Sequence, residues 1–271
     1  MRSLALAPLL VVLLLGMMPK DAQAALDLRR VDTFLAELPY GGDIDAVARW
    51  LQKRLEQRYA PKIKAALDDN ERAKLRAQLD REVFDFRSRV IVFDGRRTGY
   101  EVSPIAGEFL VGSNESLAVY RERQGDLYFF FINGRLWKFG RADRPDSPFA
   151  DRIATHSRRL GKPDRVVNSH DARGREVAPV KAAWQDDRVT VRLWNRRLLY
   201  GYDVLFVQHR PIADRIDELR GGRAASDQHG GVDPDLESFL LGEGEDEEDE
   251  LRRKELEHRH EHEQRVEHRS D

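Results

Sequence analysis

The sequence predicts an α+β fold in which N-terminal helices precede an antiparallel β-meander domain with one or two packed helices. Apolar residues recur at helical spacing between Leu28 and Phe86. From about Arg89 the pattern changes to short β-branched and aromatic runs separated by turn residues. We therefore expect a signal peptide over 1–24, a helical segment over 25–87, an α+β domain over 88–220 and a disordered acidic, histidine-containing tail over 221–271.

Three helices are expected before the first strand. The first is indicated by four apolar residues that end before Gly41-Gly42: Leu28, Val31, Leu35 and Leu38. Asp43 is a typical N-cap for the second helix, and Pro61 is expected to interrupt it. Asp68 stands three residues before Glu71, the spacing of a capping box that opens a third helix. One apolar stripe on each helix indicates that each packs on another part of the fold or on a partner.

The strongest strand signal is "LYFFFINGRLWKF", because Asn133-Gly134 favours a tight hairpin turn. Three successive phenylalanines predict a strand that is buried on both faces, with an exposed aromatic face as the alternative. Other expected strands are "RVIVF", "GEFLVG", "SLAVYRE", "EVAPVKAAW", "RVTVRLW" and "LLYGYDVLFV". Between them, Ser147 is predicted to cap a helix that Gly161 and Pro163 end. A last short helix is expected in "PIADRIDELR".

Two hairpins share a plan that points to an internal duplication. Each follows a helix, and each carries Asn-x-Arg-Leu after a strand, at Asn133–Leu136 and at Asn195–Leu198. A duplicated helix-and-meander unit would place two helices on one antiparallel sheet. The alternative is coincidence between two ordinary hairpins, because few positions match.

The first 24 residues have the composition of an export signal. Arg2 precedes an apolar run, and Ala22-Gln23-Ala24 is a cleavage site of the kind that signal peptidase accepts. The alternative is an uncleaved N-terminal anchor. No later stretch is apolar and long enough to span a membrane, which needs about 20 residues. The chain has no cysteine, which excludes disulfides and lipidation at a cysteine. We therefore expect an exported protein, periplasmic or secreted.

Charge is divided between the two ends of the mature chain. Residues 25–220 carry a net charge of +7, whereas residues 221–271 hold 17 Asp and Glu against 7 Lys and Arg, a net of −10. A basic body outside the cytoplasm favours an envelope protein or an anionic envelope component as partner, and no nucleic acid. Arginine clusters are the candidate contacts: Arg96-Arg97, Arg121 with Arg123, and above all Arg158, Arg159, Arg196 and Arg197. The alternatives are a solvated surface of mixed charge and a tail that folds back on the body.

The tail contains two further candidates. Leu236, Phe239 and Leu240 have the helical spacing of a short docking peptide. His258 and His262 are four residues apart, so on a helix one divalent metal ion could bind both. The alternative for these histidines is a solvated helix of charge pairs.

No catalytic or cofactor motif is present in the sequence. We therefore expect an exported, non-enzymatic envelope protein that acts as an adaptor or accessory subunit. One alternative is a hydrolase or lyase whose site is scattered in sequence, with His156, His170 and Asp171 as its candidates. A second alternative is weak metal capture by the tail.

Overall fold

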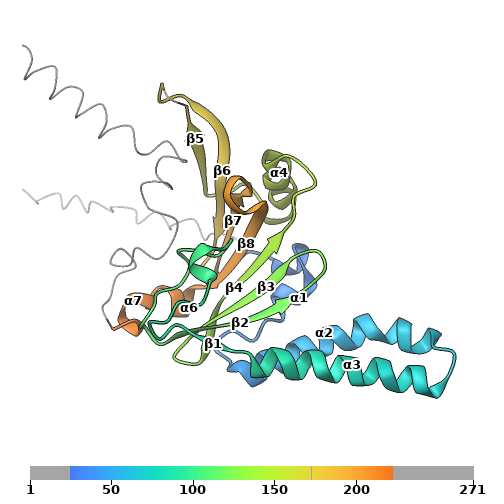
Figure 1. The fold of residues 1–271 in the computed structure, drawn as a ribbon. Helices are drawn as coiled ribbons and strands as arrows, with labels where there is room; N and C mark the ends of the chain where they lie inside the picture. Colours follow the sequence, from blue (N-terminus) through green and yellow to red (C-terminus); the bar gives the residue numbers. More distant parts are fainter. Residues whose placement is uncertain (1–24, 172, 222–271) are drawn as a thin grey trace, which may run out of the picture.

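The computed structural model describes residues 25–171 and 173–221, which form one eight-stranded antiparallel sheet with helices on both faces (Figure 1). The strand order is β1-β2-β3-β4-β8-β7-β6-β5. The strands are β1 (Ile91–Val92), β2 (Glu115–Arg121), β3 (Asp126–Ile132), β4 (Arg135–Asp143), β5 (Arg165–His170), β6 (Glu176–Gln185), β7 (Val189–Arg196) and β8 (Tyr202–His209).

Long helices precede the sheet, and shorter ones lie between and after its strands. They are η1 (Leu28–Arg30), α1 (Thr33–Ala36), α2 (Ile44–Ala65), α3 (Asp69–Ser88), η2 (Tyr100–Val102), α4 (Phe149–Leu160), α5 (Arg197–Tyr200), α6 (Arg210–Ala213) and α7 (Ile216–Leu219). The predicted fold class, N-terminal helices followed by an antiparallel sheet with a few packed helices, is confirmed. The predicted signal peptide and all but the first residue of the predicted tail lie outside the described residues.

The sheet has a hydrophobic core on each face, and β3 contributes side chains to both cores. Phe129 and Phe131 belong to the core under α2, α3 and α4, and Phe130 belongs to the core under α6 and α7. All three are at most 2% exposed, so the prediction of burial on both faces is confirmed. Asn133 and Gly134 turn the chain between β3 and β4 with positive φ angles of 48° and 72°, as expected for this hairpin.

The N-terminal helices pack on the sheet, a question that the sequence left open. Val47, Leu51 and Leu55 of α2 are fully buried in the same core as Phe129. The chain entering α2 also pairs with β4, because the N–H of Gly41 donates to the carbonyl of Leu136 at 2.8 Å. The helical segment and the sheet therefore share one core.

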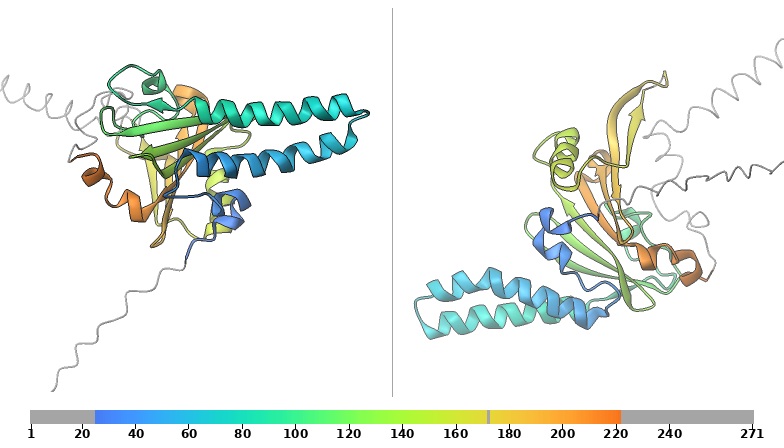
Figure 2. Two further views of the ribbon diagram at one scale, coloured as in Figure 1. Left: turned by 90° about the horizontal axis from the view of Figure 1, so that it is seen from below. Right: turned by 180° about the vertical axis from the view of Figure 1, so that it is seen from behind.

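Beyond this base, α2 and α3 extend away from the sheet as an antiparallel helical hairpin (Figures 1 and 2). Both predicted caps are present: Asp43 accepts the N–H of Ala46 at 2.9 Å, and Asp68 accepts that of Glu71 at 2.7 Å. The predicted interruption at Pro61 is wrong, because α2 continues to Ala65. Pro61 is exposed, so its missing hydrogen bond is lost on the solvent side, while packing against α3 holds the other side.

Local patterns failed at five further places. The first expected helix is two short pieces, η1 and α1, although its leucines are buried. "GEFLVG" forms no strand, since Gly107 and Gly112 both adopt a φ of 77°. Strand β5 was not predicted, because its residues are mostly polar or exposed at the sheet edge. Ser147 does not cap α4, whose N-cap is Pro148 without a side-chain hydrogen bond. The final helix divides into α6 and α7.

The strand order has the symmetry that a duplicated unit would produce. Strands β1 to β4 and β5 to β8 are each consecutive in the sheet, and the two sets meet where β4 pairs with β8. The Asn-x-Arg-Leu anchors both fall where the third strand of their set leads into the fourth, the first running from the turn into β4 and the second from the end of β7 into α5. A common origin of the two halves stays a prediction. Among the described helices, none is both long and apolar enough to cross a membrane.

Candidate functional site

A pocket of about 540 Å³ lies where the base of the helical hairpin meets the outer edge of β2. We call it the junction pocket. Its apolar wall comes from Phe86, Ile91 and Val119, which belong to three different elements. Five cationic side chains also line it: Arg58, Lys62, Arg89, Arg121 and Arg123. The pocket therefore combines an apolar surface with a concentration of positive charge.

A group of hydrogen-bonded side chains forms part of the pocket lining. Tyr59 of α2 donates to one carboxylate oxygen of Glu82 at 2.5 Å, and Tyr120 of β2 donates to the other at 2.7 Å. Arg58 donates to the Tyr120 hydroxyl at 3.0 Å and also pairs with Glu122. These contacts join α2, α3 and β2 at one point.

The protonation states of these side chains suit a structural role, which is to hold the helices on β2. Burial and the neighbouring Glu82 raise the pKa of Tyr59 to about 12. Burial, with Glu82 beside it, also raises the pKa of Tyr120. Burial acts to raise the pKa of Glu82, but the two phenol hydrogen bonds and Arg58 hold it below its ordinary value. At neutral pH the phenols therefore keep their protons and the carboxylate keeps its charge, which is the arrangement that these hydrogen bonds need.

Three of the five cations remain open to a ligand. Arg58 pairs with Glu122, and Arg89 pairs with Asp85 at 3.3 Å. Within the described part of the chain, no carboxylate lies within 4 Å of the charged groups of the other three cations: Lys62, Arg121 and Arg123. All three are exposed. The pocket can therefore accept an anionic group without first breaking an ion pair.

The outer edge of β2 adds main-chain donors and acceptors to this charge. Strand β1 pairs only with Ser116 and Leu117 of β2. Reciprocal bonds between Glu122 and Gly125, at 3.1 and 3.4 Å, set the alternation of the β2–β3 ladder. By that alternation the N–H and C=O groups of Val119 and Arg121 point away from β3. Both residues line the pocket, and neither main chain has a strand partner there among the described residues.

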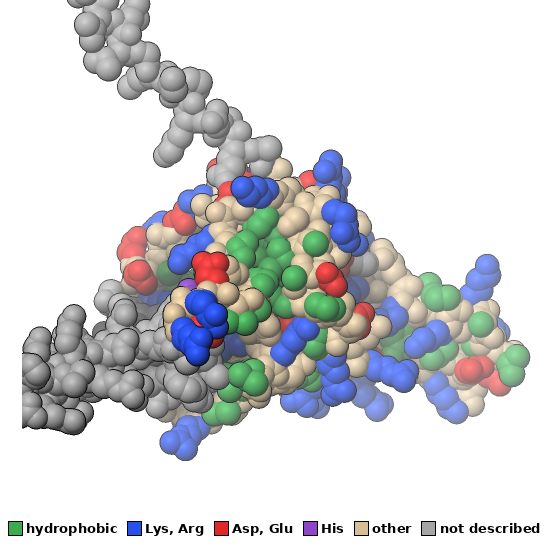
Figure 3. All heavy atoms as spheres, turned by 90° about the horizontal axis from the view of Figure 1, so that it is seen from above, with side chains coloured by type: hydrophobic (Ala, Val, Ile, Leu, Met, Phe, Trp, Pro, Cys, Tyr) green, Lys and Arg blue, Asp and Glu red, His purple; other side chains and the backbone are tan. Residues whose placement is uncertain are grey.

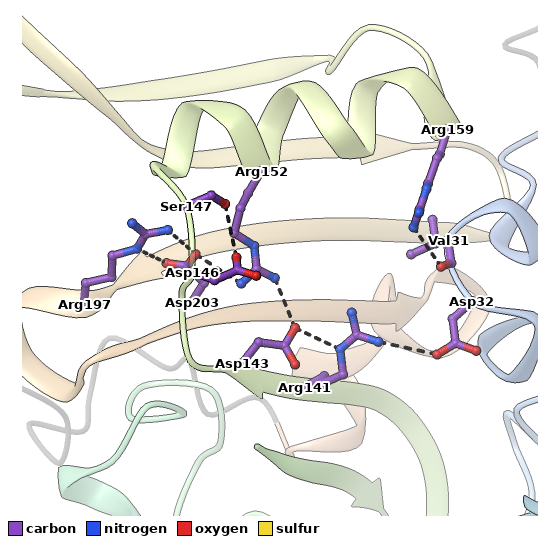
Figure 4. Close-up of polar contacts among 10 residues, drawn as sticks. All are labelled: Val31, Asp32, Arg141, Asp143, Asp146, Ser147, Arg152, Arg159, Arg197 and Asp203. Carbon is purple, nitrogen blue, oxygen red and sulfur yellow. Dashed lines mark hydrogen bonds and ion pairs between the residues drawn. The ribbon is translucent and has the colours of Figure 1, made fainter. Parts of the chain in front are cut away.

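The four arginines that the sequence singled out do not form one cluster. Arg158 and Arg159 are exposed in the last turn of α4, where Arg159 donates to the carbonyl of Val31 at 3.2 Å. Arg196 is buried, stacks 3.5 Å from the centre of the Trp194 ring and donates to the Ala106 carbonyl. Arg197 makes two bonds to Asp203, at 2.7 and 2.6 Å. Figure 4 places Arg159 and Arg197 at opposite ends of α4.

Arg197 is instead one end of a chain of ion pairs that reaches the junction pocket. Part of it is drawn in Figure 4, where Arg152 of α4 lies between Asp143 and Asp203 at 3.1 and 3.3 Å. Nine side chains alternate in sign along it: Arg58, Glu122, Arg54, Asp32, Arg141, Asp143, Arg152, Asp203 and Arg197. The chain connects α2, the β2–β3 turn, the N-terminal segment, β4, α4, β8 and α5, so it fixes the helices on the sheet.

The candidates for a catalytic group are far apart. His156 is buried against Trp184, with ring centres 6.1 Å apart. His170 pairs in register with Glu176, which precedes Trp184 by eight residues along β6, or about 25 Å. Asp171 accepts three bonds from Arg175, one from the main-chain N–H at 3.0 Å and two from the guanidinium group at 2.8 and 2.6 Å. His156 therefore shares no site with the other two.

The tail candidates, namely His258, His262, Leu236, Phe239 and Leu240, lie outside the described residues. Within the part of the chain that the structure describes, no group of three or more His, Asp or Glu side chains is arranged to hold a metal ion.

A second hollow, of about 240 Å³, lies over β5, β6 and β7. Two of its three cations already have partners: Lys181 stacks 4.0 Å from the Trp194 ring, and Arg192 pairs with Glu108 at 2.7 Å. The third, Arg165, is exposed. Seen from above the orientation of Figure 1, the molecule carries a strip of hydrophobic side chains with both acidic and basic side chains beside it (Figure 3). The second hollow offers less open charge than the junction pocket does.

Sequence reasoning found only part of the junction pocket. It named Arg121 and Arg123 as one of several clusters, but it missed Lys62, Tyr59 and Glu82. A local signal existed, since Tyr59 and Lys62 are three residues apart on one helix. Their meeting with β2 depends on how the hairpin docks, which no local pattern encodes. Comparison of the chain with models of protein families, with curated proteins and with solved structures found no match.

Proposed function

We propose that this protein is exported and works without catalysis as a binding subunit of a cell-envelope assembly, holding an acidic segment of a partner protein in the junction pocket. One observation carries the proposal. Lys62, Arg121 and Arg123 make no ion pair within 4 Å in the described chain, although Arg121 attracts Asp126, its register partner on β3. They stand beside the part of the β2 edge, at Val119 and Arg121, that has no strand partner among the described residues.

The chemistry of the pocket favours a protein segment over a lipid or a glycan. An extended peptide can bond to the main-chain groups of Val119 and Arg121 and so lengthen the sheet, which is a common mode of peptide recognition. Its Asp and Glu side chains then reach the guanidinium groups of Arg121 and Arg123, which match carboxylates in geometry. A lipid headgroup or a sulfated sugar would use the charges but leave the strand edge unpaired.

The envelope part of the proposal is supported by the sequence of residues 1–24, which has the basic start, apolar run and Ala-x-Ala site of an export signal. It predicts that the chain recovered from the envelope fraction begins at Ala25. Mass spectrometry of the purified chain tests this. A chain that retains its first residues and stays in the cytosolic fraction would remove the export part of the proposal.

The binding part is tested by crosslinking in living cells. A photoreactive amino acid replaces Gln124, which is exposed beside Arg123 and has no hydrogen bond that the change would remove. The full-length chain should capture one partner, through a peptide rich in Asp and Glu. The double variant Arg121→Glu with Arg123→Glu should lose this product, since it repels an acidic segment.

The matched control places the same photoreactive group at Val177, which is 64% exposed near the tip of the β5–β6 hairpin. This site should not capture the same peptide. Equal capture from both sites, or capture that survives the two charge reversals, would contradict the assignment of the junction pocket.

A further inference from the structure

We infer that the junction pocket is occupied, until a partner arrives, by the protein's own C-terminal segment, residues 236–250. This inference rests on the proposed function and adds its regulation. The segment and an acidic partner would compete for one site, so the chain would carry its own competitor.

The composition of this segment complements the pocket. Seven of the eight residues from Glu243 to Glu250 are Asp or Glu, the exception being Gly244. Four large apolar residues of the segment precede this acidic block: Leu236, Phe239, Leu240 and Leu241. The pocket likewise has two parts, an apolar wall at Phe86, Ile91 and Val119 and the three open cations. One short segment therefore carries both kinds of side chain that the pocket can bind.

The described chain ends close enough to the junction pocket for residues 236–250 to reach it. Arg220 donates to the carboxylate of Glu115 at 2.8 Å, which fixes the end of α7 at the start of β2. Arg121, at the pocket, is the other end of this seven-residue strand, roughly 20 Å away. Fourteen residues lie between Gly221 and Leu236. The fifteen Cα–Cα steps that join these two residues can span up to about 50 Å. The segment can therefore reach its own pocket.

Charge also favours docking in the same molecule. The residues after Arg220 carry −10 and the mature body before them +7, so the two parts attract each other. The acidic block would face exposed cations, and attraction between exposed charges is screened strongly as salt rises. Docking should therefore weaken in high salt, whereas a contact made only by the apolar residues would not.

The absence of cysteine makes a distance measurement straightforward, because any cysteine that is introduced is the only one to carry a spin label. In the full mature chain, Gln124→Cys places a label next to Arg123, which lines the pocket, and Gly244→Cys labels the acidic block without changing charge. We expect a narrow distribution of short distances between these labels. It should broaden in 1 M NaCl, where the screening length is about 3 Å, and in the Arg121→Glu with Arg123→Glu background.

The control pair joins Gly244→Cys to Val177→Cys and should give no short, narrow distribution in either salt. If the Gln124 pair is as broad as this control, the inference fails. Chains that carry only one label each, mixed at equal concentration, distinguish a second copy as the occupant. A short distance in that mixture would overturn docking within one molecule.

A competition assay separates this inference from the proposed function. The probe is a fluorescent peptide with the sequence of residues 236–250, added to the full chain and to a variant whose acidic block is changed to Gln and Asn. Removal of the competitor should tighten peptide binding by about tenfold or more. If the peptide binds both chains with equal affinity, docking of the protein's own segment is contradicted. The proposed function would then still be decided by the crosslinking result. No binding to either chain would count against both.

Discussion

Tyr120 donates its hydroxyl proton to Glu82 at 2.7 Å, and this bond joins the edge of the sheet to a helix that lies 38 residues earlier in the chain. Glu82 also accepts from Tyr59, so one carboxylate connects both helices of the hairpin to β2. The junction pocket is formed at this contact. Its shape therefore depends on long-range contacts, although its open charges come from short stretches of sequence.

Removal of this bond should loosen the base of the hairpin. Tyr120→Phe leaves the partly buried Glu82 with one hydrogen-bond donor fewer, which should cost about 1–2 kcal/mol in the free energy of unfolding. Urea denaturation of the purified chain measures this. Tyr100→Phe is the matched control, since Tyr100 lines the same pocket and its hydroxyl makes no hydrogen bond to the described residues. Equal losses in the two variants would contradict the role assigned to Tyr120.

Acid should destabilise the fold through His156. Burial, with the nearby positive charges of Arg152, Arg141 and Arg159, lowers the pKa of His156 from 6.5 to about 4. Between these values the unfolded chain binds a proton that the folded chain does not. The contribution of His156 to stability is therefore complete above about pH 6.5 and is lost as the pH falls toward 4, by roughly 3 kcal/mol in all.

The comparison of two variants isolates this effect. His156→Phe should flatten the fall in the free energy of unfolding between pH 7 and pH 4. His170→Gln is the matched control, because His170 is exposed at the end of β5. If the slope persists in His156→Phe, another group is responsible for it.

The ion pair between Lys138 and Glu108 should respond unequally to the loss of its two members. Both side chains are buried, 2.9 Å apart, and Arg192 pairs with the same carboxylate oxygen at 2.7 Å. Glu108→Leu leaves the amine of Lys138 buried between aromatic rings without this carboxylate, so we expect a loss of about 3–5 kcal/mol. Lys138→Met should cost less, because Glu108 keeps Arg192.

The double variant Glu108→Leu with Lys138→Met should be more stable than Glu108→Leu alone, since no buried amine without its carboxylate remains at this position. Urea denaturation of the three variants gives the order of their free energies of unfolding. A larger loss for Lys138→Met than for Glu108→Leu would show that Lys138, and not Glu108, is the centre of this cluster.

The elements that the sequence predicted well are those whose information is local. The caps at Asp43 and Asp68 and the Asn133-Gly134 turn each depend on a few adjacent residues, and all three are present. Strand β5 was missed because it lies at the edge of the sheet, where half-exposed residues give no apolar alternation. Pro61 was misjudged because packing on α3 outweighs the loss of one hydrogen bond.

The candidate site was harder to predict because charge in the sequence does not show which arginines are already paired. Arg196 and Arg197 looked open as part of a basic cluster, yet one is buried on Trp194 and the other binds Asp203. Arg121 and Arg123 looked no different in sequence. Only the fold separates a cation that holds the structure together from one that faces a pocket without a partner.

The turn beside the pocket should tolerate no side chain at Gly125. A Cβ atom built there would lie 1.7 Å from the carbonyl oxygen of Ala142, so the β2–β3 turn would have to move. Gly134 also has a positive φ, of 72°, but a Cβ there would meet nothing within 4 Å. Gly134→Ala should therefore cost only backbone strain, about 1–2 kcal/mol, and Gly125→Ala should cost clearly more.

Because this turn carries Arg123, a Gly125→Ala chain that still folds should also bind the acidic peptide less tightly, while Gly134→Ala should bind it normally. Urea denaturation and peptide titration of both variants measure the two effects, and equal behaviour of the variants would refute the close approach of Gly125 to β4.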